Sequence, residues 1–270
     1  MLFSEVLGQD KVKKKLINAA REGRISHAQL FLGPPGSGKL PLALAYAQYI
    51  NCANPSETDS CGVCPSCIKM SKLSHPDLHF IFPVAPLKSN DDPLSKDFLG
   101  VWRDFLFNNQ AYVDLHGWLA TMGIENKQAF IRAKDCDEII KNLSLTSYEA
   151  GYKIMIIWMA ERFYHTGAPK ILKILEEPHD KTLFILIAEH QEELLATIRS
   201  RTQLVKVLRI DDDIILKTLV EKHNITPEKA KQIVFLADGN YRAALDLSDT
   251  DEDMEELFST FREWMLQCYF

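Results

Sequence analysis

The 270-residue sequence has no apolar run long enough to cross a membrane. A helical span needs about 20 consecutive apolar residues, whereas the apolar runs at 154–160 and 183–188 have the length of buried strands. The first nine residues also lack the basic start and long apolar run of a secretory signal. We therefore expect a cytoplasmic protein with no membrane partner.

The sequence also lacks an excess of positive charge. Its 31 Lys and Arg residues are outnumbered by 37 Asp and Glu residues, which gives a net charge of −6. A protein that coats nucleic acid alone needs a basic surface to neutralise phosphates. We therefore expect any DNA contact to come from a local patch or from partner subunits.

Short apolar runs alternate with segments of helical periodicity up to about residue 209. The expected strands cover residues 29–32, 78–83, 153–158, 182–188 and 203–208, and the expected helices cover 9–22, 42–50, 135–143 and 169–176. Strands that alternate with helices in this way indicate an α/β domain with a mostly parallel sheet. Residues 85–128 interrupt the pattern, and we interpret them as a partly helical insertion that packs its own aromatic side chains.

The strand signal ends after residue 211. Residues 212–223, 226–237 and 241–247 have the periodicity of three short helices, and 255–270 begin another amphipathic helix. We interpret 1–209 as the α/β domain and 210–250 as a small three-helix lid domain. Residues 251–270 are expected to be the start of a third helical domain that is cut short.

A phosphate-binding loop follows the first expected strand. The segment Gly33-Pro34-Pro35-Gly36-Ser37-Gly38-Lys39 fits the first seven positions of the pattern Gly-x4-Gly-Lys-[Ser/Thr]. Glycines let backbone N–H groups surround phosphate oxygens, and a lysine at a helix N-terminus adds positive charge. The candidate nucleotide-binding residues are Gly33, Gly36, Ser37, Gly38 and Lys39.

The groups that such a loop needs for metal and water chemistry are missing. Leu40 stands where a hydroxyl would bind Mg²⁺, and Trp158 and Met159 stand where the second strand would end in acidic residues. Glu161 lies past the strand end and could replace the metal ligand only after a register shift. We therefore expect no Mg²⁺ site and no hydrolysis, with binding of ATP or ADP left open.

Four of the six cysteines fall between residues 52 and 67. Cys52, Cys61, Cys64 and Cys67 supply four thiolates, and short Cys-x2-Cys turns suit tetrahedral zinc. Disulfides are a poor alternative in a cytoplasmic protein. A redox-active Cys-x2-Cys pair is a further possibility, but such a pair lies at a helix start after a strand, and these cysteines are not in that position. We expect a structural Zn²⁺ module at 52–67.

Several stretches together resemble the delta-prime and gamma/tau subunits of DNA polymerase III in bacterial clamp loaders, which are AAA+ proteins. These stretches are VLGQ at 6–9, RISHA at 24–28, LKILEEP at 172–178 and LLATIRSRT at 194–202. The resemblance covers about residues 1–250 apart from the insertion, and the family carries a similar four-cysteine zinc module. The missing metal groups favour the delta-prime type, a nucleotide-inactive stator, over the gamma/tau type, an active ATPase. A small-molecule P-loop kinase would explain neither the cysteines nor Ser200-Arg201.

The resemblance implies roles for two arginines. Arg201 matches an arginine finger that would reach into the ATP site of a neighbouring subunit; without the resemblance it would be a solvated arginine near a helix. Arg242 matches a nucleotide-sensing arginine of the lid, or a retained structural arginine. The implied partners are the gamma/tau and delta type subunits of the polymerase holoenzyme, with the sliding clamp and primer-template DNA reached through the complex. No intrinsic catalysis is expected.

Overall fold

The computed structural model describes residues 1–86, 92–144, 151–164, 168–249 and 253–269. Five strands form one sheet in the order β2-β3-β4-β1-β5, and every ladder between them is parallel. The strands are β1 (Ala28–Leu32), β2 (Leu78–Ile81), β3 (Lys153–Trp158), β4 (Thr182–Ala188) and β5 (Gln203–Lys206). The expected α/β class with a parallel sheet is confirmed.

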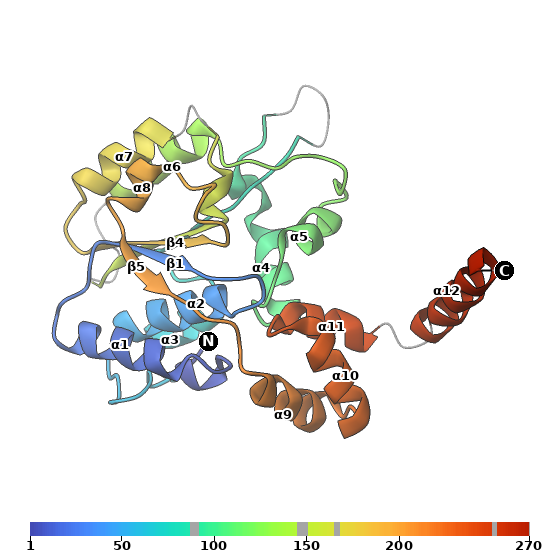
Figure 1. Ribbon diagram of the computed structural model, residues 1–270. Helices are drawn as coiled ribbons and strands as arrows, with labels where there is room; N and C mark the ends of the chain where they lie inside the picture. The colour runs from blue at the N-terminus through green and yellow to red at the C-terminus, as the bar shows by residue number, and fades with distance from the viewer. Residues whose placement is uncertain (87–91, 145–150, 165–167, 250–252, 270) are drawn as a thin grey trace.

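Helices cover both faces of the sheet (Figure 1). One face carries α1 (Asp10–Arg21), α2 (Lys39–Ile50) and α3 (Pro65–Ser71), and the other carries α6 (Ala133–Ser144), α7 (Ala168–Glu176) and α8 (Ala196–Arg199). Because side chains alternate along a strand, Ile154 and Ile156 pack in the apolar cluster that contains α2. Met155 and Ile157 pack in the cluster that contains α7. Burial on both faces explains why β3 and β4 are apolar throughout.

The expected insertion forms three helical segments within its described part. These are a 3-10 turn η2 (Ser95–Phe98), α4 (Leu99–Asn108) and α5 (Leu115–Thr121). Trp102 stacks on Phe82 with ring centroids 4.4 Å apart and lies 5.0 Å from the ring of Trp158. The aromatic side chains of the insertion therefore pack on the end of β3 and on the residue after β2, as well as on one another.

Three helices follow the sheet and share an apolar cluster of their own. They are α9 (Asp212–His223), α10 (Pro227–Ala237) and α11 (Tyr241–Asp249), and we call them the three-helix unit. Its cluster includes Ile215, Leu219 and Tyr241, and Tyr112 from the insertion joins it. The insertion and the three-helix unit are therefore in direct contact.

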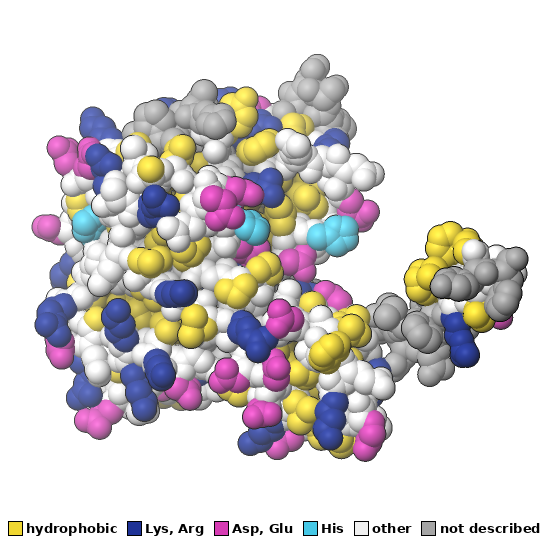
Figure 2. Space-filling model, viewed as in Figure 1, with side chains coloured by type: hydrophobic (Ala, Val, Ile, Leu, Met, Phe, Trp, Pro, Cys, Tyr) yellow, Lys and Arg dark blue, Asp and Glu magenta, His cyan; other side chains and the backbone are white. Residues whose placement is uncertain are grey.

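The last helix, α12 (Asp253–Tyr269), exposes large apolar side chains. Phe261, Trp264, Met265 and Leu266 are all exposed, and they lie on a helix that stands away from the sheet (Figures 1 and 2). Within the described residues, no helix is both long enough and apolar enough to cross a membrane. Residues 87–91 of the expected insertion, and 250–252 and 270 of the expected C-terminal units, lie outside the described residues.

Two further short 3-10 helices lie in the described part of the chain, η1 (Phe3–Glu5) and η3 (Ala160–Arg162). The first begins near the cysteine-rich loop, because the N–H groups of Phe3 and Ser4 both donate to the carboxylate of Asp59 at 2.9 Å. The second follows β3 and carries Glu161 to the carboxyl edge of the sheet. Both segments border the candidate sites.

Candidate functional site

The candidate phosphate loop connects β1 to α2, as the sequence predicts. Gly36 and Gly38 have positive φ angles of 64° and 83°, which suit glycine. Lys39 is the first residue of α2 and Ser37 is fully buried. The strand, loop and helix are therefore in the arrangement that binds phosphate in P-loop proteins.

The ammonium group of Lys39 is already occupied by the protein itself. Its Nζ donates to the backbone oxygens of Gly33 at 2.9 Å and Pro34 at 2.5 Å. It also pairs with Glu189 Oε1 at 3.2 Å, and only 5% of the lysine side chain is exposed. Burial lowers the pKa of Lys39 and the charge of Glu189 opposes that shift. Since an ammonium has three donors, these three partners leave none directed at a phosphate.

Tyr112 closes the mouth of the loop. A Cβ atom placed on Gly38 would lie 3.2 Å from Cε1 of Tyr112, so the ring covers this glycine. The N–H of Leu7 donates to the Tyr112 hydroxyl at 2.8 Å and fixes the ring in place. The cavity beside Lys39, lined by Tyr112, Trp158 and Glu189 among others, has a volume of ≈ 20 Å³. That space holds about one water molecule, far less than a nucleotide triphosphate.

The three-helix unit lies against the other side of the loop. The N–H of Tyr241 donates to the oxygen of Gly36 at 3.3 Å. Asn240 Oδ1 would lie 1.8 Å from a Cβ atom placed on Gly36. The same oxygen accepts from the N–H of Ala243 at 3.1 Å, in the first turn of α11. The start of α11 therefore packs directly on the phosphate loop.

The positions for metal and water chemistry carry apolar side chains in the structure. Leu40 is buried in the core beneath the loop, and Trp158 and Met159 are buried beside it. Glu161 accepts a hydrogen bond from the N–H of Glu189 at 2.9 Å, and burial raises its pKa. Its carboxylate therefore links the ends of β3 and β4.

Arg201 lies just after α8 and contacts its own chain. Its Nε donates to Glu176 Oε1 at 2.6 Å, and Nη2 lies against the same carboxylate oxygen. Its Nη1 donates to the backbone oxygen of Thr197 at 3.0 Å. The side chain remains 35% exposed. The Arg201 side chain is thus accessible to solvent, but its guanidinium is paired with Glu176, the last residue of α7.

Arg242 pairs with residues of α11 and of the insertion. Its Nη1 donates to Asn109 Oδ1, its Nε donates to Asp246 Oδ2 at 3.1 Å, and it lies 3.8 Å from Asp114. These partners join α11 to the insertion. Of the two roles left open by the sequence, the geometry favours the structural one.

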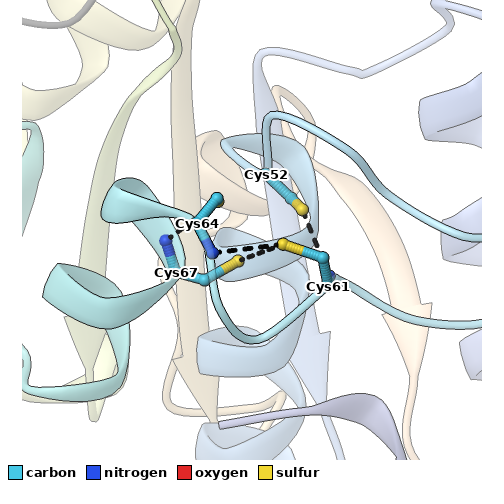
Figure 3. Close-up of side chains that lie close together, drawn as sticks. All are labelled: Cys52, Cys61, Cys64 and Cys67. Atoms are coloured by element: carbon cyan, nitrogen blue, oxygen red, sulfur yellow. Dashed lines mark hydrogen bonds between the residues drawn. The ribbon is translucent and has the colours of Figure 1, made fainter.

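The four clustered cysteines come together at the start of α3 (Figure 3). The Sγ atoms of Cys52, Cys61, Cys64 and Cys67 all lie within 4.8 Å of one another. A Zn–S bond of about 2.3 Å requires sulfur separations near ~3.8 Å in a tetrahedron, and the Cys61 and Cys67 sulfurs are 3.9 Å apart. The cluster could therefore hold a metal ion, consistent with zinc.

Backbone N–H groups prepare part of this cluster for negative charge. Cys61 Sγ accepts from the N–H of Cys64 at 3.4 Å, and such backbone hydrogen bonds, led by that of Val63, lower the pKa of Cys61 to about 6. Burial instead raises the pKa of Cys67 and of Cys52. Without a cation the buried thiols therefore favour the protonated form, so the cluster suits a bound cation better than free thiolates.

A family model described as DNA polymerase III, delta subunit, matches residues 8–211, which is most of the chain. The chain belongs to this DNA polymerase III delta subunit family. The resemblance expected from the sequence is confirmed, and the fold is AAA+-like.

Two curated relatives and one solved structure illustrate the likeness. DNA polymerase III subunit delta' of Bacillus subtilis is 29% identical over 92% of this chain and 61% of its own length. DNA polymerase III subunit gamma/tau of Mycobacterium bovis is 30% identical over 74% of this chain and 27% of its own length. The Thermotoga maritima RuvB Holliday junction branch migration motor has a TM-score of 0.50 at 16% identity, over 95% of this chain and 66% of that one. At that identity the likeness concerns the fold alone.

The chain spans about three fifths of the length of the delta' relative that it matches. The sequence analysis gave no role to four residues that contact the candidate sites: Tyr112, Glu176, Glu189 and Asn240. Glu189 directly follows a predicted strand, so its place at the carboxyl edge of a parallel sheet was an available signal. Tyr112 and Asn240 come from distant segments, and no local pattern links them to the loop.

Proposed function

We propose that this chain is a non-hydrolysing, delta'-type subunit of a bacterial DNA polymerase III clamp loader. The observation that carries the proposal is the closed phosphate loop, in which Tyr112, Trp158 and the Lys39–Glu189 pair leave a cavity of only ≈ 20 Å³. A subunit whose phosphate loop neither binds Mg²⁺ nor admits a triphosphate can act as a fixed member of a ring of active ATPases. Its partners would be gamma/tau and delta type subunits, with the sliding clamp and primer-template DNA reached through the complex.

Loss of hydrolysis in this proposal has two separate causes. Leu40, Trp158 and Met159 provide no oxygen for Mg²⁺ or for the attacking water. The loop is also filled by side chains of the same molecule, because Lys39 binds Gly33 and Pro34. The absence of Mg-dependent turnover therefore does not depend on any one residue.

The active contribution of the chain would be Arg201, donated to the ATP site of a neighbouring subunit. A guanidinium stabilises the charge that develops on a transferred phosphoryl group. Arg201 is accessible at the end of α8, and it lies in the stretch at 194–202 that resembles the family's finger motif. Arg242 would serve to hold the lid in place through Asn109 and Asp246.

The cysteine cluster would bind one structural Zn²⁺. All four positions of a tetrahedron are supplied by Cys52, Cys61, Cys64 and Cys67, so no coordination position is left for a substrate. We assign the domains as residues 1–209 (AAA+ domain with the zinc module at 52–67 and the insertion at 85–128), 210–250 (lid) and 251–270 (start of a third helical domain). The apolar cluster of the three-helix unit supports the boundary between residues 209 and 210.

Replacement of Arg201 tests the proposal in a complex reconstituted with gamma/tau and delta type subunits. Arg201→Ala should leave this chain folded and reduce ATP turnover at the one site that it faces. An arginine finger contributes roughly 10³–10⁵ in rate where it is best measured, and the loss in the whole complex should be smaller because the other sites keep their own fingers. Lys at this position should not restore turnover, because an ammonium lacks the planar fork.

Arg199→Ala provides the matched control, since Arg199 is an exposed arginine two residues earlier in the same segment. It should leave turnover unchanged. If Arg201→Ala assembles normally and loads clamps at the wild-type rate, the proposed finger role of Arg201 is wrong. The chain would then be better described as a passive scaffold. Mg-dependent turnover by the isolated wild-type chain would instead support an active gamma/tau-type ATPase.

A further inference from the structure

The side chain of Glu176 engages the guanidinium of Arg201 more fully than a passing surface contact would. One carboxylate oxygen of Glu176 faces the Nε and Nη2 edge of the guanidinium, with the Nε distance at 2.6 Å. The Nη1 group donates to the oxygen of Thr197 at 3.0 Å and to Ser200 Oγ at 3.3 Å. All three nitrogens of the guanidinium therefore have partners within the same chain.

Two of the residues that contact Arg201, Glu176 and Thr197, lie on different helices. Glu176 is the last residue of α7, where the chain turns at Pro178, and Arg201 follows the short helix α8. The backbone of α8 supplies the Thr197 oxygen, so the guanidinium lies between two helix ends. Glu176 and Arg201 lie in the stretches 172–178 and 194–202, which are two of those that carry the resemblance to clamp-loader subunits.

We propose that Glu176 is the positioning residue of Arg201: it holds the guanidinium in a docked state that nucleotide phosphates of a neighbouring subunit must displace. This inference rests on the proposed function of Arg201 as a finger, and it adds a regulatory step to that function. In the docked state the fork used for bidentate recognition of phosphate is committed to the carboxylate. An anion of higher charge placed beside Arg201 competes with Glu176 for this fork.

Exposure makes such an exchange feasible. Half of the Glu176 side chain and about a third of the Arg201 side chain are exposed, so water screens the pair. Exposed ion pairs of this kind shift an equilibrium by roughly fivefold at most. A triphosphate carries more negative charge than a carboxylate and can accept the same fork. Docking therefore lowers the population of the engaged finger without blocking it.

The expected consequence is a weaker apparent affinity for ATP at the faced site. When only a fraction of molecules is competent, the apparent dissociation constant rises by the inverse of that fraction. Glu176→Gln removes the negative charge, retains the shape of the side chain and frees Arg201. It should lower the apparent KM for ATP in the reconstituted complex roughly two- to fivefold, with kcat unchanged.

The test compares four variants of the 270-residue chain in the reconstituted complex: Glu176→Gln, Glu177→Gln, Arg201→Ala and the double variant Glu176→Gln/Arg201→Ala. Glu177 is the adjacent exposed carboxylate, so Glu177→Gln has the same charge change and should leave KM unaltered. The double variant should match Arg201→Ala, because the carboxylate acts only through the arginine. Thermal unfolding of each chain checks folding, and Glu176→Ala repeats the measurement if the Gln variant is unstable.

The outcomes separate this inference from the proposed function. If Arg201→Ala lowers turnover but Glu176→Gln leaves KM and kcat unchanged, the finger holds and the docked state is wrong. If Glu176→Gln lowers kcat, Glu176 supports the engaged finger and the inference is also overturned. If Arg201→Ala has no effect, the proposed function fails and the inference fails with it.

Discussion

Lys39 illustrates how a residue can keep its position in a motif and change its partners. In the expected phosphate loop its ammonium would contact phosphate, whereas here it binds Gly33, Pro34 and Glu189. Burial of an ion pair costs desolvation energy, so the pair stabilises the fold only while both charges are present. Two predictions at the residue scale follow from this site.

Glu189→Ala should destabilise the chain by about 3 kcal/mol at neutral pH, because it leaves a buried ammonium without its counter-charge. The pKa of Lys39 is already lowered in the folded chain, and loss of Glu189 should lower it further. Between that lowered pKa and the usual lysine value the unfolded chain binds more protons, so stability should rise with pH. Chemical denaturation at pH values from 7 to 10 should therefore show a decreasing difference in the free energy of unfolding between the wild-type chain and Glu189→Ala.

The control for this prediction removes both charges. Lys39→Met/Glu189→Leu should cost less than Glu189→Ala alone, because no unpaired charge remains buried. A single variant with wild-type stability across the pH range would show that the ion pair contributes nothing.

Leu40→Thr tests the loss of hydrolysis at a single position. The new hydroxyl restores one metal-binding group, yet Trp158 and Met159 still provide no carboxylate and the cavity stays near ≈ 20 Å³. We expect no Mg-dependent ATPase activity from the isolated variant, measured beside an active gamma/tau relative as the positive control. Turnover restored by this substitution alone would contradict the degenerate site.

At the scale of elements, the proposed zinc module at 52–67 is attached to the sheet domain and has a small apolar cluster of its own. The four cysteines form one apolar cluster, while Met70 and Leu73 at the end of α3 belong to the main core. Loss of the metal should therefore loosen residues 52–67 without unfolding the sheet.

Cys64→Ser separates the ligand role from the capping role. Cys64 is the N-cap of α3 and its sulfur accepts from the N–H of Cys67 at 3.4 Å, a role that serine fills well. The variant should lose the zinc that we expect the wild-type chain to hold, and it should exchange amide hydrogens faster at 52–67. Its thermal midpoint should change little.

Elemental analysis and hydrogen exchange check this prediction, with Cys268→Ser as the control that keeps one zinc per chain. Acidification should release the metal from the wild-type chain, because protonation competes with metal at each thiolate. Protein purified without chelators and found to hold no zinc would defeat the assignment.

The elements themselves were largely predictable from sequence, and the closed site was not. Continuous apolar runs fixed the bounds of β3 and β4, because strands buried on both faces need apolar residues throughout. The spacing of the glycines and of the four cysteines was sufficient to identify both candidate sites. Closure by Tyr112 depends on how the insertion packs on α11, and the docking of Arg201 depends on where α7 ends. Such contacts between distant segments leave no periodic pattern.

At the scale of the whole molecule, α12 differs from the rest of the chain. Its Phe261, Trp264 and Leu266 side chains are about half exposed, while the clusters of the sheet and of the three-helix unit are complete without them. Apolar side chains left in water contribute nothing to stability and favour association.

A chain shortened after Asp249 should therefore keep the thermal midpoint of the 270-residue chain and associate less. Differential scanning calorimetry measures the first quantity and light scattering at increasing concentration measures the second. Substitution of Lys for Trp264 in the full sequence is a milder version of the same change and should reduce association alone. A fall of several degrees in the midpoint on shortening would show that α12 packs against the remaining chain.

The contact between Asn240 and Gly36 gives the glycines of the loop a second explanation besides phosphate binding. Any side chain at position 36 would collide with Asn240 Oδ1, and one at position 33 would meet the oxygen of Val207 at 2.0 Å. Close packing of Gly36 on Asn240 and of Gly33 on Val207 would therefore be sufficient to retain both glycines in a chain that binds no nucleotide. A signature search that scores glycine spacing would still report a nucleotide site in a protein that has filled it with its own residues. The side chains at 40, 112 and 158 are the better diagnostic, because they are the ones that a bound nucleotide and its metal could not tolerate.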